Sequence, residues 1–233
     1  MLTGFEYLLT KRHIQSATEQ SLAPQVESLL LSARTRLAPL LPNYSSQQNY
    51  KRDDVLLLLI LFSDWLQGEW LDQFSNTLLL QVEPANEIEL SFWTKNGYAI
   101  PDGLQDSVSE AFQSSRDWAR IADVTLNRTV NSILRWDAQE NLTRRDLDAL
   151  LDYWYSQNRA GNIASNETTA LNSLLTKEYM QRLELRRWVW WTTPPEYTIC
   201  PFCRERHGVT YDITDPMPPL HNHCKCIPEI LFE

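Results

Sequence analysis

The chain has 233 residues, of which 43% are hydrophobic and nine are tryptophan, enough apolar surface to form a sizeable core. Its net charge of −9 argues against a protein that coats nucleic acid nonspecifically, because such proteins are normally basic. The presence of only six glycines disfavours an all-β architecture with many tight turns and favours helices.

Helical periodicity dominates the first part of the chain. It predicts one helix over residues 3–41 and a second helical block over residues 55–82, which Asp53 and Asp54 can cap. The longest apolar run, Val55 to Phe62, lies in the second block and is far shorter than the roughly 20 residues that cross a bilayer. We therefore expect a buried helix there. Prolines and glycines interrupt residues 83–103, where the alternation of Ile88, Leu90 and Phe92 indicates a short strand.

Three more helices are expected before the character of the chain changes. One covers residues 104–139. Thr143, with Asp146 three residues later, resembles a capping box and opens a second helix that should stop near Gly161. A third helix is expected over residues 163–185.

The C-terminal part differs in composition from this helical body. Residues 186–195, "RRWVWWTTPP", are aromatic and β-branched and predict a strand. Residues 197–233 contain all four cysteines, three of the four histidines and five of the twelve prolines. The expected fold class is mainly α: a helical body over residues 1–160, then a small α+β module over residues 161–233 with a zinc-stapled hairpin or loop.

The cysteines suggest a tetrahedral metal site built from two short ligand pairs. Cys200 and Cys203 form a C-x-x-C pair, and His221, Cys224 and Cys226 follow. Structural zinc takes four cysteine or histidine ligands from two such pairs. We predict Cys200, Cys203, His221 and one of Cys224 or Cys226 as ligands. A proline-rich segment this short buries too little apolar surface to fix its own loops, so a structural zinc ion would supply the missing stability.

Other interpretations of the cysteines are weaker. Two disulfides are compatible with an even count, but the N-terminus has no signal-peptide pattern and a reducing compartment is expected. A thioredoxin-like C-x-x-C would leave the second cysteine pair without a role. The letters "HNH" of residues 221–223 do not indicate a nuclease, because consecutive residues point in different directions and only one histidine can serve as a ligand.

No catalytic or cofactor-binding motif stands out elsewhere. Walker A, G-x-S-x-G and H-E-x-x-H patterns are absent from the sequence. Asp146, Asp148 and Asp152 share one helix face, which we interpret as solvated. Arg186 and Arg187, beside three tryptophans, could meet a phosphate backbone, but packing of the tryptophans is an equally good interpretation.

The last seventy residues, read together, resemble the phage minor head, or head-morphogenesis, family typified by the phage Mu F protein and the minor capsid protein of phage SPP1. The family pattern opens on a helix with Ile-Ala-x-x-Glu and continues through a tryptophan-containing strand, Cys-Pro-x-Cys, and Pro-Pro-x-His followed by two cysteines. The matching residues here are Ile163, Ala164, Glu167, Asn172, Cys200, Pro201, Cys203, Gly208, Tyr211, Pro218, Pro219, His221, Cys224 and Cys226. Ser165, Asn166, Asn222 and Lys225 depart from the pattern but leave the predicted ligands in place.

This resemblance implies a non-enzymatic, minor structural component of a tailed-phage head. Such a protein would be made in the host bacterial cytoplasm and sit in few copies in the virion head near the portal. It would contact portal or capsid proteins, with phage DNA as a further candidate partner and no membrane, and would aid capsid assembly, DNA packaging or DNA ejection. The alternative is an enzyme acting on nucleic acid or a nucleotide, with a zinc-stabilised tail. A zinc-dependent DNA-binding module is disfavoured by the acidic charge.

Overall fold

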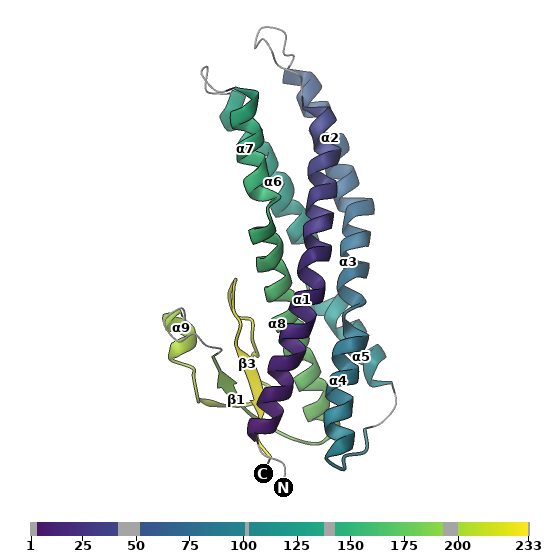
Figure 1. Ribbon diagram of the computed structural model, residues 1–233, viewed down its shortest axis with the longest axis vertical. Coiled ribbons are helices and arrows are strands. Elements are labelled where there is room, and N and C mark those ends of the chain that lie inside the picture. Colours follow the sequence, from purple (N-terminus) through teal and green to yellow (C-terminus); the bar gives the residue numbers. More distant parts are fainter. Residues whose placement is uncertain (1–3, 42–51, 101–102, 138–142, 193–199, 233) are drawn as a thin grey trace. The chain divides into compact units, whose positions relative to one another are not determined.

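The computed structural model describes residues 4–41, 52–100, 103–137, 143–192 and 200–232. Within these ranges the chain is mainly helical, and a small antiparallel sheet lies near the C-terminus (Figure 1). The predicted fold class, a mainly α chain that ends in a small α+β module with a Cys/His cluster, is therefore confirmed.

Helices account for most of the described elements. In chain order they are α1 (Gly4–Leu37), the 3₁₀ turn η1 (Ala38–Leu40), α2 (Arg52–Trp65), the π-helical turn η3 (Leu66–Trp70), α3 (Leu71–Leu79), α4 (Val82–Lys95), α5 (Leu104–Ser115), α6 (Ala119–Asp137), α7 (Arg144–Trp154), α8 (Gln157–Arg182) and the short α9 (Pro201–Arg204). The strands are β1 (Arg187–Trp191), β2 (Thr210–Asp212) and β3 (Ile227–Ile230).

The chain forms two compact units, and neither is continuous in sequence. Unit 1 comprises residues 1–23, 78–116 and 162–233, and unit 2 comprises residues 24–77 and 117–161. Helices α1 and α8 each contribute to both units. The domain division expected from the sequence, a helical body over residues 1–160 and a module over residues 161–233, stays a prediction.

Two predicted helical blocks agree with the structure. Helix α1, together with η1, covers nearly all of residues 3–41. The block expected over residues 55–82 is the run α2, η3 and α3, in which the helical path continues through a π-helical turn. Long apolar periodicity was a reliable signal in both places.

Helix α2 begins at Arg52, so Asp53 and Asp54 lie inside the helix and do not precede it as caps. The expectation of a buried helix over residues 55–62 is wrong in part, because Leu57, Ile60 and Leu61 are more than half exposed.

The strand expected at residues 88–92 is wrong, because this stretch lies inside α4. The buried residues of α4 fall at helical spacing and include two polar side chains: Val82, Ala85, Asn86, Glu89 and Trp93. Since Asn86 and Glu89 occupy the buried face, the apolar residues alone showed a misleading period of two. Pro84 is accommodated because it lies in the first turn, where its missing N–H has no helical partner to lose.

Two expected helix boundaries also need correction. The helix predicted over residues 104–139 is interrupted at residues 116–118, between α5 and α6. The helix that starts after Thr143 ends at Trp154 rather than near Gly161, and α8 runs through Gly161 without a break. The boundary lies instead at Ser156, whose Oγ accepts a hydrogen bond from the backbone N–H of Arg159 at 3.4 Å.

The capping box at the start of α7 is confirmed. The Thr143 side chain accepts a hydrogen bond from the backbone N–H of Asp146, and the Asp146 carboxylate accepts one from the backbone N–H of Thr143 at 2.7 Å. Hydrogen bonds from the Thr143 hydroxyl and backbone lower the pKa of Asp146 below its ordinary value. The ionised carboxylate is therefore the form that stabilises this helix end.

We expect Thr143→Ala to lower the free energy of unfolding by about 1 kcal/mol, because a helix end loses its cap. Because the pKa of Asp146 is lowered on folding, its contribution is present above the unfolded pKa of about 3.9 and is lost as the pH falls below it. Urea unfolding of both proteins at neutral pH and near pH 3 measures this. If the two proteins differ in free energy of unfolding by the same amount at both pH values, the carboxylate does not have this role.

The sheet has the order β2-β1-β3, with both neighbours antiparallel to the central strand β1. Strand β1 carries the tryptophans of the predicted 186–195 strand, and Trp188 and Trp190 are fully buried. The Trp188 ring stacks on Tyr211 of β2 at a centroid distance of 4.9 Å, and its indole N–H donates to the Asp212 carbonyl at 2.9 Å. Packing therefore accounts for these two tryptophans.

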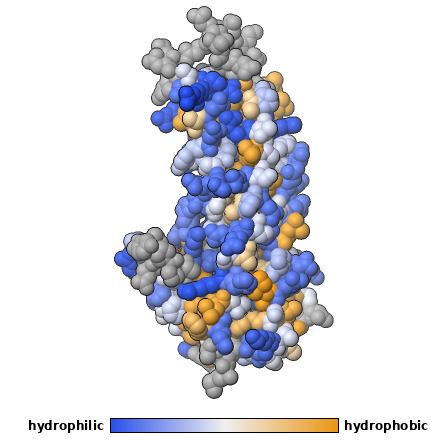
Figure 2. All heavy atoms as spheres, in the orientation of Figure 1, coloured by the Kyte–Doolittle hydropathy of each residue, from blue (hydrophilic) through white to orange (hydrophobic). Residues whose placement is uncertain are grey.

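Each unit has its own aromatic core. In unit 1, Trp93 stacks on Tyr179 at 5.8 Å and packs against Tyr7 at 5.5 Å. In unit 2, Trp70 stacks on Phe74 at 5.2 Å, and its indole N–H donates to the Leu29 carbonyl at 2.8 Å. Hydrophilic side chains predominate on the face shown in Figure 2, with apolar ones interspersed among them. None of the described helices is both long enough and apolar enough to span a bilayer.

Candidate metal centre

The two cysteine-containing stretches meet in unit 1, and their side chains form two overlapping groups of donors. Cys200, Cys203 and His221 form one group, and Cys203, Cys224 and Cys226 form the other. In each group the sulfur and nitrogen atoms that could bind a metal lie within 4.8 Å of one another. All five residues predicted from the sequence therefore belong to one cluster, with Cys203 common to both groups.

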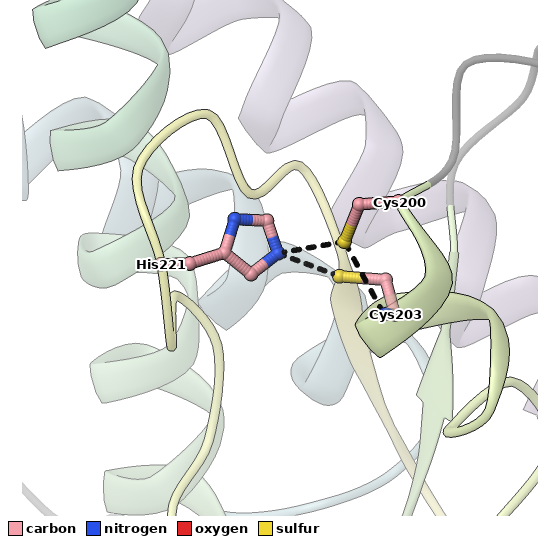
Figure 3. A group of neighbouring side chains, drawn as sticks. All are labelled: Cys200, Cys203 and His221. Carbon is pink, nitrogen blue, oxygen red and sulfur yellow. Dashed lines mark hydrogen bonds between the residues drawn. The ribbon is translucent and has the colours of Figure 1, made fainter.

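The first pair of cysteines lies on a tight helical turn. Cys200 precedes α9, and its sulfur accepts a hydrogen bond from the backbone N–H of Cys203 at 3.3 Å. Pro201 occupies the first helical position, where its fixed φ favours the turn. This local geometry directs both sulfurs toward the His221 ring (Figure 3).

The second stretch forms its own turn around Asn222 and His223. The backbone N–H of Cys224 donates to the His221 carbonyl at 3.3 Å, and His223 has a positive φ of 63°. His223 is exposed and does not belong to either donor group. The structure thus brings one histidine of "HNH" to the cluster, as the sequence analysis predicted, and directs the other elsewhere.

The orientation of His221 suits a metal ligand. Its Nδ1 lies 2.7 Å from the Asn222 carbonyl oxygen, so Nδ1 must carry the proton and donate it. The lone pair is then on Nε2, which lies 3.3 Å from the Cys200 sulfur and 2.9 Å from the Cys203 sulfur (Figure 3). A backbone acceptor on one ring nitrogen is the usual way in which a protein fixes the tautomer of a metal-binding histidine.

The distances between the donors are close to those of a tetrahedral site. Two thiolates bound to zinc at about 2.3 Å lie about 3.8 Å apart, and a thiolate and an imidazole nitrogen lie somewhat closer. The Cys203 and Cys224 sulfurs are 4.0 Å apart, and the Cys–His distances are the 3.3 and 2.9 Å given above. These distances are compatible with a metal ion bound by this cluster.

Burial and the charges of neighbouring sulfurs give the thiols different pKa values. Burial and the charge of Cys224 raise the pKa of Cys203 to about 12. A hydrogen bond from the Cys226 thiol lowers the pKa of Cys224 to about 6, and the same hydrogen bond and burial raise the pKa of Cys226. Deprotonating several of these thiols would place like charges in one small volume, and a divalent cation at their centre would offset that repulsion. All four cysteines are free thiols rather than disulfides.

Two residues that the sequence analysis missed hold the second stretch in place. Thr169 of α8 donates its hydroxyl to the Cys224 carbonyl at 2.9 Å. Gln15 of α1 donates its side-chain amide to the Lys225 carbonyl at 3.4 Å and to the Thr169 hydroxyl at 3.2 Å. Neither residue lies near the cysteines in sequence, so no local pattern could identify it. Together they fix the backbone that carries Cys224.

The helix residues that carry the family resemblance have structural partners within unit 1. Glu167 accepts two hydrogen bonds from the Arg116 guanidinium, at 3.0 and 2.6 Å. Asn172 donates its amide to the Lys11 carbonyl at 3.1 Å. Both side chains are buried. They stabilise the packing of α8 and do not belong to the metal-binding groups.

The remaining candidates do not belong to the two donor groups. His207 has its Nδ1 2.8 Å from the Thr192 hydroxyl and packs against the Trp191 ring. The aspartate face is only partly solvated: Asp146 caps α7, whereas Asp148 and Asp152 pair with Arg34 of α1. No protein-family model, curated protein or solved structure matches this chain.

Proposed function

We propose that this chain is a minor structural protein of a tailed-phage head, and that a single zinc ion cross-links the Cys/His cluster of its C-terminal module. The observation that carries the zinc assignment is the convergence of four thiols and one imidazole in two overlapping groups, each with its donor atoms within 4.8 Å of one another. Cysteine and histidine are the ligands that structural zinc prefers, whereas calcium and magnesium require oxygen ligands.

Among the five donors, Cys200, Cys203, His221 and Cys224 form the proposed ligand set. Cys203 contacts the His221 nitrogen on one side and lies 4.0 Å from the Cys224 sulfur on the other. Cys226 then serves as a neighbour that donates its thiol hydrogen to Cys224. This choice assigns one ion to one chain and leaves Cys226 outside the first coordination sphere.

The role in the phage head is supported by the ordered set of residues from Ile163 to Cys226 that resembles the head-morphogenesis family. A site in which the metal has four protein ligands favours a structural rather than a catalytic ion, since a catalytic zinc keeps a position open for water or substrate. The proposed partners are portal or capsid proteins, contacted by few copies of this chain in the head.

We expect the purified chain to contain about one zinc per molecule by elemental analysis. Cys203→Ser should lose most of the metal because Cys203 belongs to both donor groups, whereas Cys226→Ser should keep it. If Cys226→Ser loses zinc and Cys224→Ser retains it, the ligand set is wrong. If freshly reduced, folded wild-type protein contains no metal, the zinc assignment is wrong.

The head assignment has its own test. The open reading frames beside the gene should encode a portal protein upstream and a scaffold or major capsid protein downstream, and the chain should sediment with assembled heads. Failure to associate with heads or with the portal, together with turnover of DNA, RNA or NAD by the purified chain, would favour the enzyme alternative. A point change at one carboxylate should then abolish that turnover.

A further inference from the structure

Arg159 in unit 2 is a half-buried cation that is held by neutral groups. It lies in the first turn of α8, and its guanidinium donates to the Trp154 carbonyl at 2.7 Å and to the Thr125 hydroxyl at 2.6 Å. Thr125 is fully buried on α6 and in turn donates to the Ile121 carbonyl. These contacts fix the position of the guanidinium but leave its charge unbalanced.

A second guanidinium lies beside the same tryptophan. The Arg128 guanidinium carbon is 4.6 Å from the centre of the Trp154 ring, so this exposed side chain stacks on the indole whose own carbonyl Arg159 binds. Burial lowers the pKa of Arg159, the neighbouring Tyr155 partly offsets this, and the positive charge of Arg128 lowers the pKa again. The two cations are thus close enough to repel each other.

Three of the other half-buried arginines among the described residues have carboxylate partners. Arg34 pairs with Asp148 and Asp152, Arg116 pairs with Glu167, and Arg144 pairs with Asp148. Across the described parts of the chain, no carboxylate forms an ion pair with Arg128 or Arg159. Charges that are partly withdrawn from water are normally paired, and Arg159 lacks the carboxylate that Arg34, Arg116 and Arg144 possess.

The donors that remain suit an oxyanion. A guanidinium offers five N–H groups in a planar fork, and the described contacts of Arg159 use two of them. The fork matches the spacing of oxygens in a carboxylate or phosphate, and two neighbouring guanidinium groups favour a multiply charged phosphate. The Trp154 ring holds Arg128 in place and reduces the conformational entropy that binding would cost.

We propose that Arg128 and Arg159 form a binding site for a phosphate group on unit 2. Thr125 and Trp154 position Arg159, Trp154 also positions Arg128, and the phosphate oxygens replace the missing carboxylate. The same chemistry is offered by inorganic phosphate and by the phosphodiester backbone of a nucleic acid. The site is independent of the metal cluster and of the proposed role in a phage head, and it stands if either of those is wrong.

Thermal unfolding of the full, metal-containing chain tests the site with inorganic phosphate as the probe. At equal ionic strength and pH, the unfolding midpoint of the wild type should be higher in phosphate than in chloride. Arg128→Gln and Arg159→Gln should each weaken phosphate binding by about tenfold, the effect of one lost charge-assisted hydrogen bond. Because Arg128 is exposed and its described contact is only with the Trp154 ring, its variant should fold normally even if Arg159→Gln is destabilised.

Arg120→Gln is the matched control, since it removes the same charge from an exposed position on the same helix. A second arm measures the fluorescence anisotropy of a labelled single-stranded oligonucleotide. Tighter binding of the oligonucleotide than of phosphate, lost in both test variants, identifies a nucleic-acid backbone as the source, and equal or weaker binding identifies free phosphate. Absence of both effects in the wild type, or an equal loss in Arg120→Gln, would overturn the proposal.

Discussion

Lys11→Met is expected to lower the free energy of unfolding by about 3–5 kcal/mol, because it leaves a buried carboxylate without its cation. The Lys11 ammonium and the Glu89 carboxylate form an ion pair in unit 1, and both side chains are inaccessible to solvent. Lys11 also donates to the Asn172 carbonyl at 3.2 Å, and Glu89 accepts from the Tyr7 hydroxyl at 2.6 Å. Helices α1, α4 and α8 therefore share one buried polar network.

A double variant separates the cost of an unpaired charge from the net value of the pair. Lys11→Met combined with Glu89→Met removes both charges, and replacing a buried pair with apolar residues is often neutral or stabilising. We therefore expect the double variant to be more stable than Lys11→Met alone when both are unfolded in urea.

The half-exposed pair of Lys225 and Glu19 provides the control. The Lys225 Nζ and Glu19 Oε1 atoms are 3.0 Å apart, but solvent screens their interaction. Glu19→Gln should therefore lower the free energy of unfolding by less than about 1 kcal/mol. If Lys11→Met is as mild as Glu19→Gln, the Lys11 side chain is hydrated and the buried network is not as the structure describes it.

Removal of the proposed zinc ion should cause the second large effect, a loss of structure confined at first to the segment around the cluster. The elements there are too short to be stable alone: α9 has four residues and β2 has three, whereas an isolated helix of fewer than about 12–15 residues is marginal in water. Structural zinc contributes about 10–16 kcal/mol of apparent binding free energy in small zinc-finger peptides. We therefore expect chelation of the zinc ion to remove a large part of the free energy that stabilises this segment.

Hydrogen exchange of the full chain, with and without chelator, measures the effect. We expect amides in residues 200–226 to lose protection by orders of magnitude, while the helices of unit 2 keep theirs. Cys203→Ser should reproduce the chelated state without chelator, and Cys226→Ser should not. Unchanged exchange in residues 200–226 after complete metal removal would show that the hydrogen bonds of Thr169 and Gln15 to the Cys224 and Lys225 carbonyls are sufficient without a metal.

Several features followed from local sequence, because the interactions that create them span only a few residues. The capping box of Thr143 and Asp146 is a contact across three residues, and the long helix α1 follows from apolar spacing along one segment. The clustering of Cys200, Cys203, His221, Cys224 and Cys226 was also predictable. Two short ligand pairs at zinc-like spacing are a pattern in the sequence itself.

Other features depended on partners far away in the chain. Residues 82–95 form a helix rather than a strand because Glu89 is buried against Lys11 and Tyr7, and nothing near Glu89 in sequence reveals a cation 78 residues away. The same holds for Thr169 and Gln15, which hold the backbone at Cys224 and Lys225. Long-range hydrogen bonds and ion pairs leave no periodic trace in the sequence.

The sequence by itself therefore determined the fold class, the long helices and the five donor residues of the candidate metal centre. Only the tertiary structure decided how the five donors group around Cys203, which polar side chains are buried, and that Arg128 and Arg159 both contact Trp154. The physical reason is the range of the interactions. Helix propensity, capping and ligand spacing act along the chain, whereas burial and charge pairing are set by segments that meet only when the chain folds.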